Sequence, residues 1–297
     1  MQKILDQIAA KTRPLAADGA VAKYIPAFAR VDPTKFAIAV VTADGQEFTT
    51  GDADEPFSIQ SISKLFTLAL AMEWAADGLW DRVKREPSGM RFNSLILLEQ
   101  ERGVPRNPFI NAGAIIIADA LLHARPQIGA DFRNQMRLLS ASDGPTYDDE
   151  VLRSEMETGD LNRAIAFALN SYGNLRENPM KVADTYFQFC ALAMSARELA
   201  RAAMFLVSPR PGEAACAEGK HMVRLRAIMR TCGLYDQSGE FAFQVGMPAK
   251  SGVGGGILAV HPGKFVVCAW SPPLDKFGNS VAATGALSEL VKHFPFE

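Results

Sequence analysis

Strand patterns occupy both ends of this 297-residue chain, and helical patterns fill the long region between them. Residues 35–52 read KFAIAVVTADGQEFTTGD, two β-rich runs joined by Asp44-Gly45, which is a strong signal for a hairpin turn. Further strand patterns come only at 240–246, 255–263 and 264–272. Because a lone hairpin is marginally stable in water, we expect the two ends of the chain to contribute to one sheet.

This order predicts an α+β fold, with an antiparallel sheet built from N- and C-terminal strands, flanked by helices, and a large helical lobe inserted between them. The short connections within 240–272 favour antiparallel pairing, because parallel neighbours need a longer crossover. We expect one domain with a sheet lobe at about 1–57 and 235–297, a helical lobe at about 58–234, and a site in the cleft between them. The expected helices lie at 58–78, 112–124, 150–159, 161–173, 182–194, 196–207, 222–230 and 280–294.

Composition and targeting signals argue against several classes of protein. The net charge is −2, and no basic stripe carries interleaved aromatic residues, so we expect no nucleic-acid partner. The first twenty residues form an amphipathic pattern that contains Asp6 and lacks the features of a signal peptide, and no window has eighteen uninterrupted apolar residues. We therefore expect a cytoplasmic protein without a membrane span.

The cysteines and histidines show no spacing typical of a metal site. Because no Cys-x-x-Cys pair is present, we expect reduced thiols and neither a metal nor another cofactor. The scarce histidines also form no HExxH arrangement, so the base of a hydrolase would be another residue type. The residues concerned are Cys190, Cys216, Cys232, Cys268, His123, His221, His261 and His293.

The stretch FSIQSISKLF, residues 57–66, places a polar Ser-Ile-Ser-Lys step at the start of an apolar helix. Ser61 and Lys64 would lie on one face of its first turn. A lysine with a lowered pKa can take the proton of a nearby serine and make it a nucleophile. The alternative is a helix start with a solvated lysine, since Ser-x-x-Lys alone occurs often by chance.

A second motif, Lys250-Ser251-Gly252, lies in MPAKSGVGGG (247–256), just ahead of the predicted strand at 255–263. Ser-x-x-Lys followed by Lys-Ser/Thr-Gly on a strand is the signature pair of penicillin-recognising serine hydrolases. The glycines would let a substrate approach the backbone, where an N–H group can complete an oxyanion hole. The alternative here is a flexible loop with a solvated lysine.

Longer blocks closely resemble the glutaminase family, amidohydrolases that convert glutamine to glutamate and ammonia. The resemblance runs from about Tyr24 to the C-terminal helix and implies a fold similar to that of β-lactamases and transpeptidases. It also implies a homo-oligomer, commonly a tetramer. The blocks are NPFINAGAI (107–115), SEMETGDLNRAIAF (154–167), TCGLYDQSGEFAF (231–243), AKSGVGGGILAV (249–260) and WSPPLDKFGNSV (270–281).

The same resemblance implies the site residues. Ser61 matches the nucleophile of the family and Lys64 its activating lysine, while Tyr235 is a site tyrosine that would join Lys64 in proton transfer. The backbone N–H of Val253 would face the scissile carbonyl. The remaining matches are expected to bind substrate: Tyr24, Asn111, Glu155, Asn162 and Tyr186.

The chemistry of free L-glutamine fits this assignment. Its α-ammonium needs an anion, for which Glu155 is the natural partner, and its α-carboxylate needs neutral donors such as Asn111, Asn162 and Tyr186. Two other functions stay open from the sequence. One is a penicillin-interacting serine hydrolase or β-lactamase-like enzyme, which the lack of an export signal disfavours, and the other is a catalytically idle binding protein of the same fold.

Overall fold

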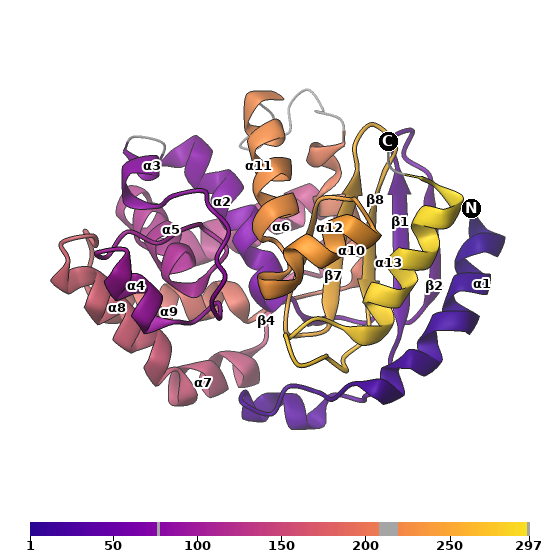
Figure 1. Ribbon diagram of the computed structural model, residues 1–297, viewed down its shortest axis with the longest axis horizontal. Coiled ribbons are helices and arrows are strands. Elements are labelled where there is room, and N and C mark those ends of the chain that lie inside the picture. Colours follow the sequence, from indigo (N-terminus) through magenta and orange to yellow (C-terminus); the bar gives the residue numbers. More distant parts are fainter. Residues whose placement is uncertain (76–77, 208–218, 296–297) are drawn as a thin grey trace.

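An antiparallel sheet joins the two ends of the chain in the computed structural model, which describes residues 1–75, 78–207 and 219–295 (Figure 1). The strand order is β2-β1-β8-β7-β6, so the N-terminal hairpin pairs with the C-terminal strands through β1 and β8. The predicted α+β fold class is thereby confirmed. The strands are β1 (Ala37–Thr42), β2 (Glu47–Gly51), β6 (Ala249–Ser251), β7 (Gly256–His261) and β8 (Phe265–Trp270).

Both faces of the sheet are covered, which explains why its central strands are apolar without interruption. Ile38 and Val40 of β1 pack in a cluster with the helices of the chain ends, whereas Ala39 of β1 faces the helical part of the molecule. The face that carries Ile38 and Val40 is covered by α1 (Gln2–Thr12), α12 (Ser238–Gln244) and α13 (Val281–His293). The opposite face contacts α10 (Ala196–Ala202). Figure 1 shows α1 and α13 side by side along the sheet.

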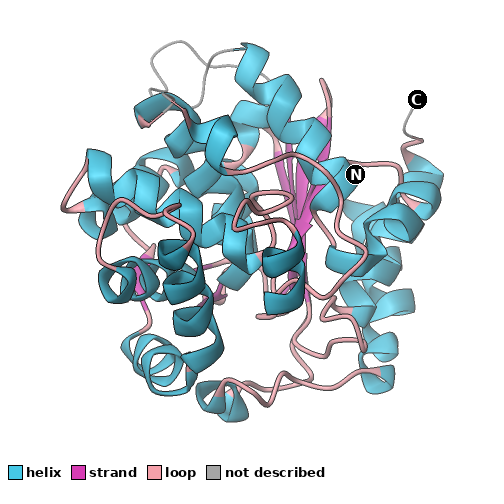
Figure 2. Ribbon diagram, turned by 60° about the vertical axis from the view of Figure 1, so that its left-hand side comes forward, coloured by secondary structure: helices cyan, strands magenta, loops and turns pink. Residues whose placement is uncertain are grey.

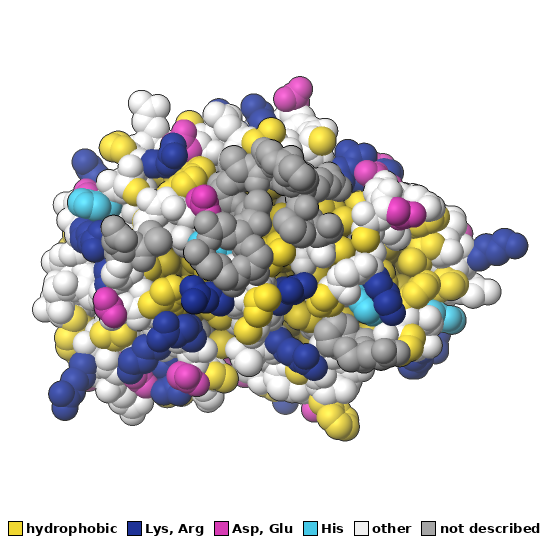
Figure 3. All heavy atoms as spheres, turned by 90° about the horizontal axis from the view of Figure 1, so that it is seen from above, with side chains coloured by type: hydrophobic (Ala, Val, Ile, Leu, Met, Phe, Trp, Pro, Cys, Tyr) yellow, Lys and Arg dark blue, Asp and Glu magenta, His cyan; other side chains and the backbone are white. Residues whose placement is uncertain are grey.

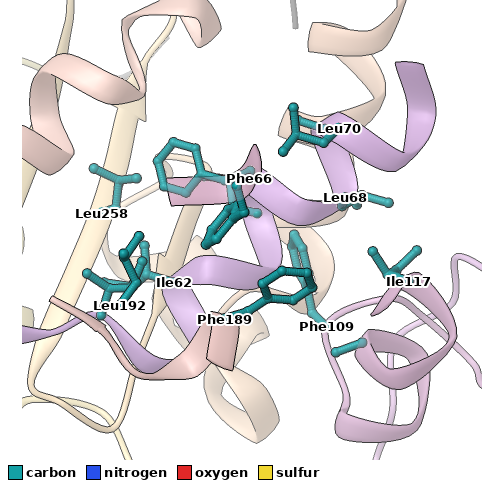
Figure 4. Close-up of a cluster of buried hydrophobic side chains, with 14 of the residues drawn as sticks. Ile62, Phe66, Leu68, Leu70, Phe109, Ile117, Phe189, Leu192 and Leu258 are labelled. Carbon is teal, nitrogen blue, oxygen red and sulfur yellow. The ribbon is translucent and has the colours of Figure 1, made fainter. Parts of the chain in front are cut away.

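Helix α2 (Ser63–Trp74) passes through the middle of the helical part and is buried from Ser63 to Met72. Its apolar side chains, and Ile62 just before the helix, meet those of neighbouring helices and of the sheet, as Phe66 and Leu258 do in Figure 4. Such enclosure fixes the direction in which the first turn of α2 points. Helices α5 (Asn111–Ala124), α9 (Pro179–Cys190) and α11 (Gly219–Cys232) contact α2. Figure 2 shows helices on both sides of the central strands. The remaining helices are α3 (Leu79–Arg82), α4 (Leu95–Gln100), α6 (Ile128–Ser140), α7 (Asp149–Thr158) and α8 (Asp160–Ser171).

The predicted strand at 240–246 is wrong, and the helices expected at 58–78, 182–194 and 196–207 are shorter than predicted, with α2 at Ser63–Trp74 and α10 at Ala196–Ala202. Residues 240–246 were expected to be a strand, but Ser238–Gln244 forms α12. Phe241 and Val245 are buried four residues apart, as on one face of a helix, while Phe243 is 88% exposed. The helix expected at 182–194 ends at Cys190, because Leu192–Met194 forms strand β5.

Strand β5 belongs to a small sheet with the order β3-β5-β4. Strand β3 (Phe57–Ser58) lies immediately before the Ser61 turn, so the small sheet anchors the approach to that turn, and β4 is Thr146–Tyr147. These short strands and the helices α4 and α6 were not predicted, although Ile128, Phe132 and Met136 of α6 recur at helical spacing. The expected boundaries between a sheet lobe and a helical lobe stay a prediction.

Other expectations concern thiols, membranes and surface charge. Cys190, Cys232 and Cys268 are buried free thiols, whereas Cys216 lies outside the described residues. No helix in the described part of the chain is long and apolar enough to cross a membrane. Figure 3 shows basic side chains distributed among apolar and acidic ones on one face of the molecule.

Candidate active site

Ser61 lies in a short 3-10 turn, Gln60–Ile62, that leads directly into α2. The preceding Gln60 has φ of 49°, a left-handed backbone conformation that is uncommon outside glycine and often found at functional sites. Ser61 is 6% exposed and lines a cleft of about 1170 Å³. The turn therefore presents this hydroxyl to a cavity instead of the protein surface.

Lys64 does not reach solvent, so the reading of a solvated lysine is wrong. Its side chain is 2% exposed, and its Nζ donates hydrogen bonds to Asn111 Oδ1 at 2.7 Å and to the Phe109 carbonyl at 3.2 Å. These partners are neutral and do not compensate a buried positive charge as a carboxylate would. Burial accordingly lowers the pKa of Lys64 to about 8. A substantial neutral fraction is therefore present near physiological pH, as a general base requires.

Tyr235 lies beside the nucleophile turn from the other side of the cleft. Its φ is 52°, and its ring packs against Phe92 at 4.7 Å between centroids. The hydroxyl is buried near Ser61 and Ser251, with no hydrogen bond of acceptable geometry among the described residues. Burial raises the pKa of Tyr235, and the nearby Ser61 and Ser251 side chains partly offset that rise. Its proton is thus held on the tyrosine with no fixed acceptor.

Lys250 is the second buried lysine, and it too is not solvated. It is fully buried in β6, donates to the Gly233 carbonyl at 3.1 Å and the Ser251 carbonyl at 2.6 Å, and lies 4.6 Å from the Tyr235 ring centroid. Burial holds its pKa well below the usual value for lysine, and Lys64 lowers it further. Its contacts tie the Tyr235 turn to β6.

Close approach of two glycines places Val253 next to the nucleophile turn. A Cβ atom on Gly252 would fall 2.5 Å from the Ile59 carbonyl oxygen, and one on Gly254 would fall 2.1 Å from the Ser58 carbonyl oxygen. Only glycine fits at these distances. The segment around Val253 is therefore seated directly on residues that precede Ser61, and Val253 lines the cleft.

A polar network forms the opposite end of the cleft. Asn111 Oδ1, which accepts the Lys64 bond, also accepts from the Tyr186 hydroxyl at 3.2 Å, and Asn111 Nδ2 donates to Asn162 Oδ1 at 2.9 Å. These side chains project from α5, α8 and α9, so three helices fix their relative positions. The network connects Lys64 physically with the residues expected to bind substrate.

Glu155 projects from α7 into the same cleft and is largely buried. Burial raises the pKa of Glu155 to about 7, against the opposing effects of the Gln60 side chain and Lys64. A desolvated carboxylate without a paired cation is a natural partner for an ammonium group. Tyr24 borders the cleft from the N-terminal segment and is 58% exposed.

The structure thus brings all nine predicted site residues to one place. Lys64 and Tyr235 lie behind the cleft surface, and the other seven line it: Tyr24, Ser61, Asn111, Glu155, Asn162, Tyr186 and Val253. Sequence reasoning missed Gln60, Phe92 and the burial of Lys250. Gln60 directly precedes the predicted nucleophile, but no sequence pattern indicated its left-handed backbone. No group of three or more His, Cys, Asp or Glu side chains in the described part of the chain is arranged to hold a metal.

Comparison with known proteins identifies the family. The glutaminase family model matches residues 19–297. The chain belongs to the glutaminase family. A glutaminase of Shewanella loihica is 50% identical over 295 residues, which cover 97% of this chain and 95% of the relative. A glutaminase of Azorhizobium caulinodans is 49% identical, with coverage of 98% and 96%.

Solved glutaminase structures share the fold over the whole chain. The structure described as probable glutaminase ybaS superposes with a TM-score of 0.93 at 36% identity, covering 100% of this chain and 97% of that one. A probable glutaminase from Bacillus subtilis, complexed with 6-diazo-5-oxo-L-norleucine, gives a TM-score of 0.85 at 30% identity, with coverage of 98% and 94%. The predicted family and the prediction of an amidohydrolase are confirmed, and membership of this family argues against a β-lactamase.

Proposed function

We propose that this glutaminase hydrolyses the side-chain amide of free L-glutamine through covalent catalysis by Ser61. The observation that carries the proposal is the buried Lys64, whose pKa of about 8 makes it a competent base one helical turn from a serine in a cleft. No histidine is needed for this step.

In the proposed first half-reaction, neutral Lys64 accepts the Ser61 proton as the Ser61 Oγ attacks the amide carbon of glutamine. The negative charge that develops on the amide oxygen is held by the backbone N–H groups of Ser61 and Val253. Protonation of the leaving nitrogen through Lys64 and Tyr235 releases ammonia and leaves a glutamyl ester on Ser61. The unpartnered Tyr235 hydroxyl supports a role as proton donor.

In the second half-reaction, water attacks the ester carbonyl and gives up a proton to Lys64. The ester bond to Ser61 breaks, the serine regains its proton, and glutamate leaves. The same two N–H groups stabilise the second oxyanion, so one geometry serves both steps.

Recognition of the free amino acid rests on the polar end of the cleft. Glu155 pairs with the α-ammonium, while Asn111, Asn162, Tyr186 and Tyr24 provide donors for the α-carboxylate or border the substrate. A glutamine within a peptide has no free ammonium or carboxylate, so it would leave Glu155 desolvated and unpaired. This cost selects free glutamine.

The deciding experiment is ammonia release from glutamine by the purified protein, with the β-lactam nitrocefin as a second substrate. Glutamine turnover without nitrocefin turnover supports the proposal. Binding of glutamate without turnover would favour an idle binding protein, and nitrocefin turnover a penicillin-interacting hydrolase. The homo-oligomeric state, a tetramer by family resemblance, stays a prediction that light scattering after gel filtration can check.

A further inference from the structure

A second cavity, of about 240 Å³, lies on the far side of Val253 from the catalytic cleft. One wall is part of the segment 21–35, which connects the N-terminal helices to β1. The others are residues 55–58, the N-terminal end of α7, and the end of β8. Val253 and its neighbour Gly254 form the partition, so the two cavities are back to back. We infer that this second cavity is a binding site for a small arylalkyl ammonium ion.

The inner surface of the second cavity suits a flat apolar group. Phe57 and Trp270 stack with ring centroids 4.7 Å apart and planes 6° from parallel. The indole Nε1 of Trp270 already donates to the Gly254 carbonyl at 3.0 Å, so its polar atom is satisfied. Phe28 and Val151 add apolar surface. An aromatic ring finds an apolar surface here, whereas a zwitterion such as glutamine would place one of its two charges against apolar side chains.

The polar edge of the cavity has a negative balance. Its charged lining residues are two cations and three carboxylates, which give a net charge of −1. An ammonium group is attracted to this edge, whereas a carboxylate would have to displace a carboxylate already in place. The cations are Arg30, which pairs with Asp148 and Glu150, and Lys35, which pairs with Asp52 and Glu55. The carboxylates that line the cavity are Asp32, Glu55 and Asp148.

A ligand in this cavity contacts the partition between the two sites. Gly254 is packed so closely on the Ser58 carbonyl that a Cβ atom would lie 2.1 Å from it. Little movement is available there without moving residues adjacent to Ser61. A ligand that presses on Gly254 would therefore also press on Val253 and on the residues before Ser61, and we expect it to alter kcat for glutamine.

Isothermal titration calorimetry with 2-phenylethylamine, 2-phenylethanol and phenylacetate tests the site, because these probes share a shape and differ in charge. We expect 2-phenylethylamine to bind the wild-type protein most tightly and phenylacetate least. Val31→Trp fills the cavity from the segment 21–35 and should weaken 2-phenylethylamine binding at least tenfold. Leu161→Trp places the same indole in the catalytic cleft and should leave 2-phenylethylamine binding unchanged.

A second variant tests the site independently in case Val31→Trp does not fold. Glu55→Gln removes one negative charge at the cavity edge with no change in shape, and should weaken 2-phenylethylamine about threefold while leaving 2-phenylethanol unaffected. Asp81→Asn, an exposed change on α3, is its control. Absence of 2-phenylethylamine binding, tighter binding of phenylacetate, or sensitivity to Leu161→Trp in place of Val31→Trp would overturn the site. Binding without any change in kcat would overturn its coupling to Val253.

Discussion

Asn111→Asp tests whether Lys64 acts as a neutral base. The substitution keeps the size of the side chain and puts a carboxylate where Asn111 Oδ1 now lies 2.7 Å from Lys64 Nζ. An opposite charge this close raises a lysine pKa by about 1–3 units, so the pKa of Lys64 should move from about 8 to roughly 9–11. The neutral fraction at pH 8 then falls from about half to roughly a tenth or less.

The assay is the initial rate of ammonia release from glutamine, measured between pH 6 and pH 10.5. We expect kcat/KM of the variant at pH 8 to fall about fivefold or more. The limb of the pH profile along which activity rises as Lys64 loses its proton should move up by about one to three pH units. Asn162→Asp is the matched control, because Asn162 meets Lys64 only through Asn111 and should shift the limb less. Melting temperatures confirm that both variants are folded.

Asn111 is also expected to bind substrate, so the shape of the pH profile must separate an effect on Lys64 from an effect on substrate binding. A loss of activity at every pH with an unshifted limb would show that Asn111 acts in binding alone. It would also remove Lys64 as the titrating base.

Three further changes address other parts of the site. Ser61→Ala should lower kcat by several orders of magnitude while glutamate binding by calorimetry persists, and retention of more than about 1% of kcat would exclude covalent catalysis. Glu155→Gln should lower kcat/KM by about thirtyfold to a thousandfold, or roughly 2–4 kcal/mol, at unchanged melting temperature, whereas a change within twofold would mean that Glu155 does not hold the ammonium. In the wild type, the fall of log kcat/KM with decreasing pH should steepen from a slope of about one to about two below pH 7, because protonation of Glu155 adds to that of Lys64, and a slope that stays near one would argue against this role. Gly254→Ala should lower both melting temperature and kcat, because the added Cβ atom would overlap the Ser58 carbonyl oxygen. Unchanged values would show that the backbone can move apart there without cost.

The sheet was predictable because its signals are local and strong. Asp44-Gly45 indicated a hairpin, and the apolar runs of β7 and β8 are typical of buried strands. The stretch 240–246 misled because Phe241 and Phe243 alternate with smaller or polar residues, a pattern of period two. In the folded chain Phe241 is buried together with Val245, four residues on, and Phe243 is exposed, so tertiary packing decided the element. Strands of two or three residues, such as β3 and β5, have too little sequence for a pattern to appear.

The sequence predicted which residues form the candidate site, but it did not predict the burial of the two lysines. Conspicuous blocks of sequence marked Ser61, Lys64 and Glu155, but burial of a lysine depends on what distant segments place around it. Lys64 and Lys250 each lie in a short polar motif that also fits a solvated lysine, at a helix start in the first case and in a loop in the second. Their lowered pKa values come from enclosure by parts of the chain far away in sequence, and a local pattern carries no information about that.

A ribosome completes β1 long before it reaches β8, although Ala37 and Trp270 are direct partners in the finished sheet. At about 5–20 residues per second, β1 waits roughly ten to fifty seconds with one edge open while the helices are made. During that interval the hairpin of β1 and β2 is an unprotected strand edge, prone to pair with other nascent chains. The amount of active enzyme recovered should therefore depend on translation speed and on chaperones that shield the emerging N-terminus, and release of a chain that stops before Phe265 leaves that edge permanently unpaired.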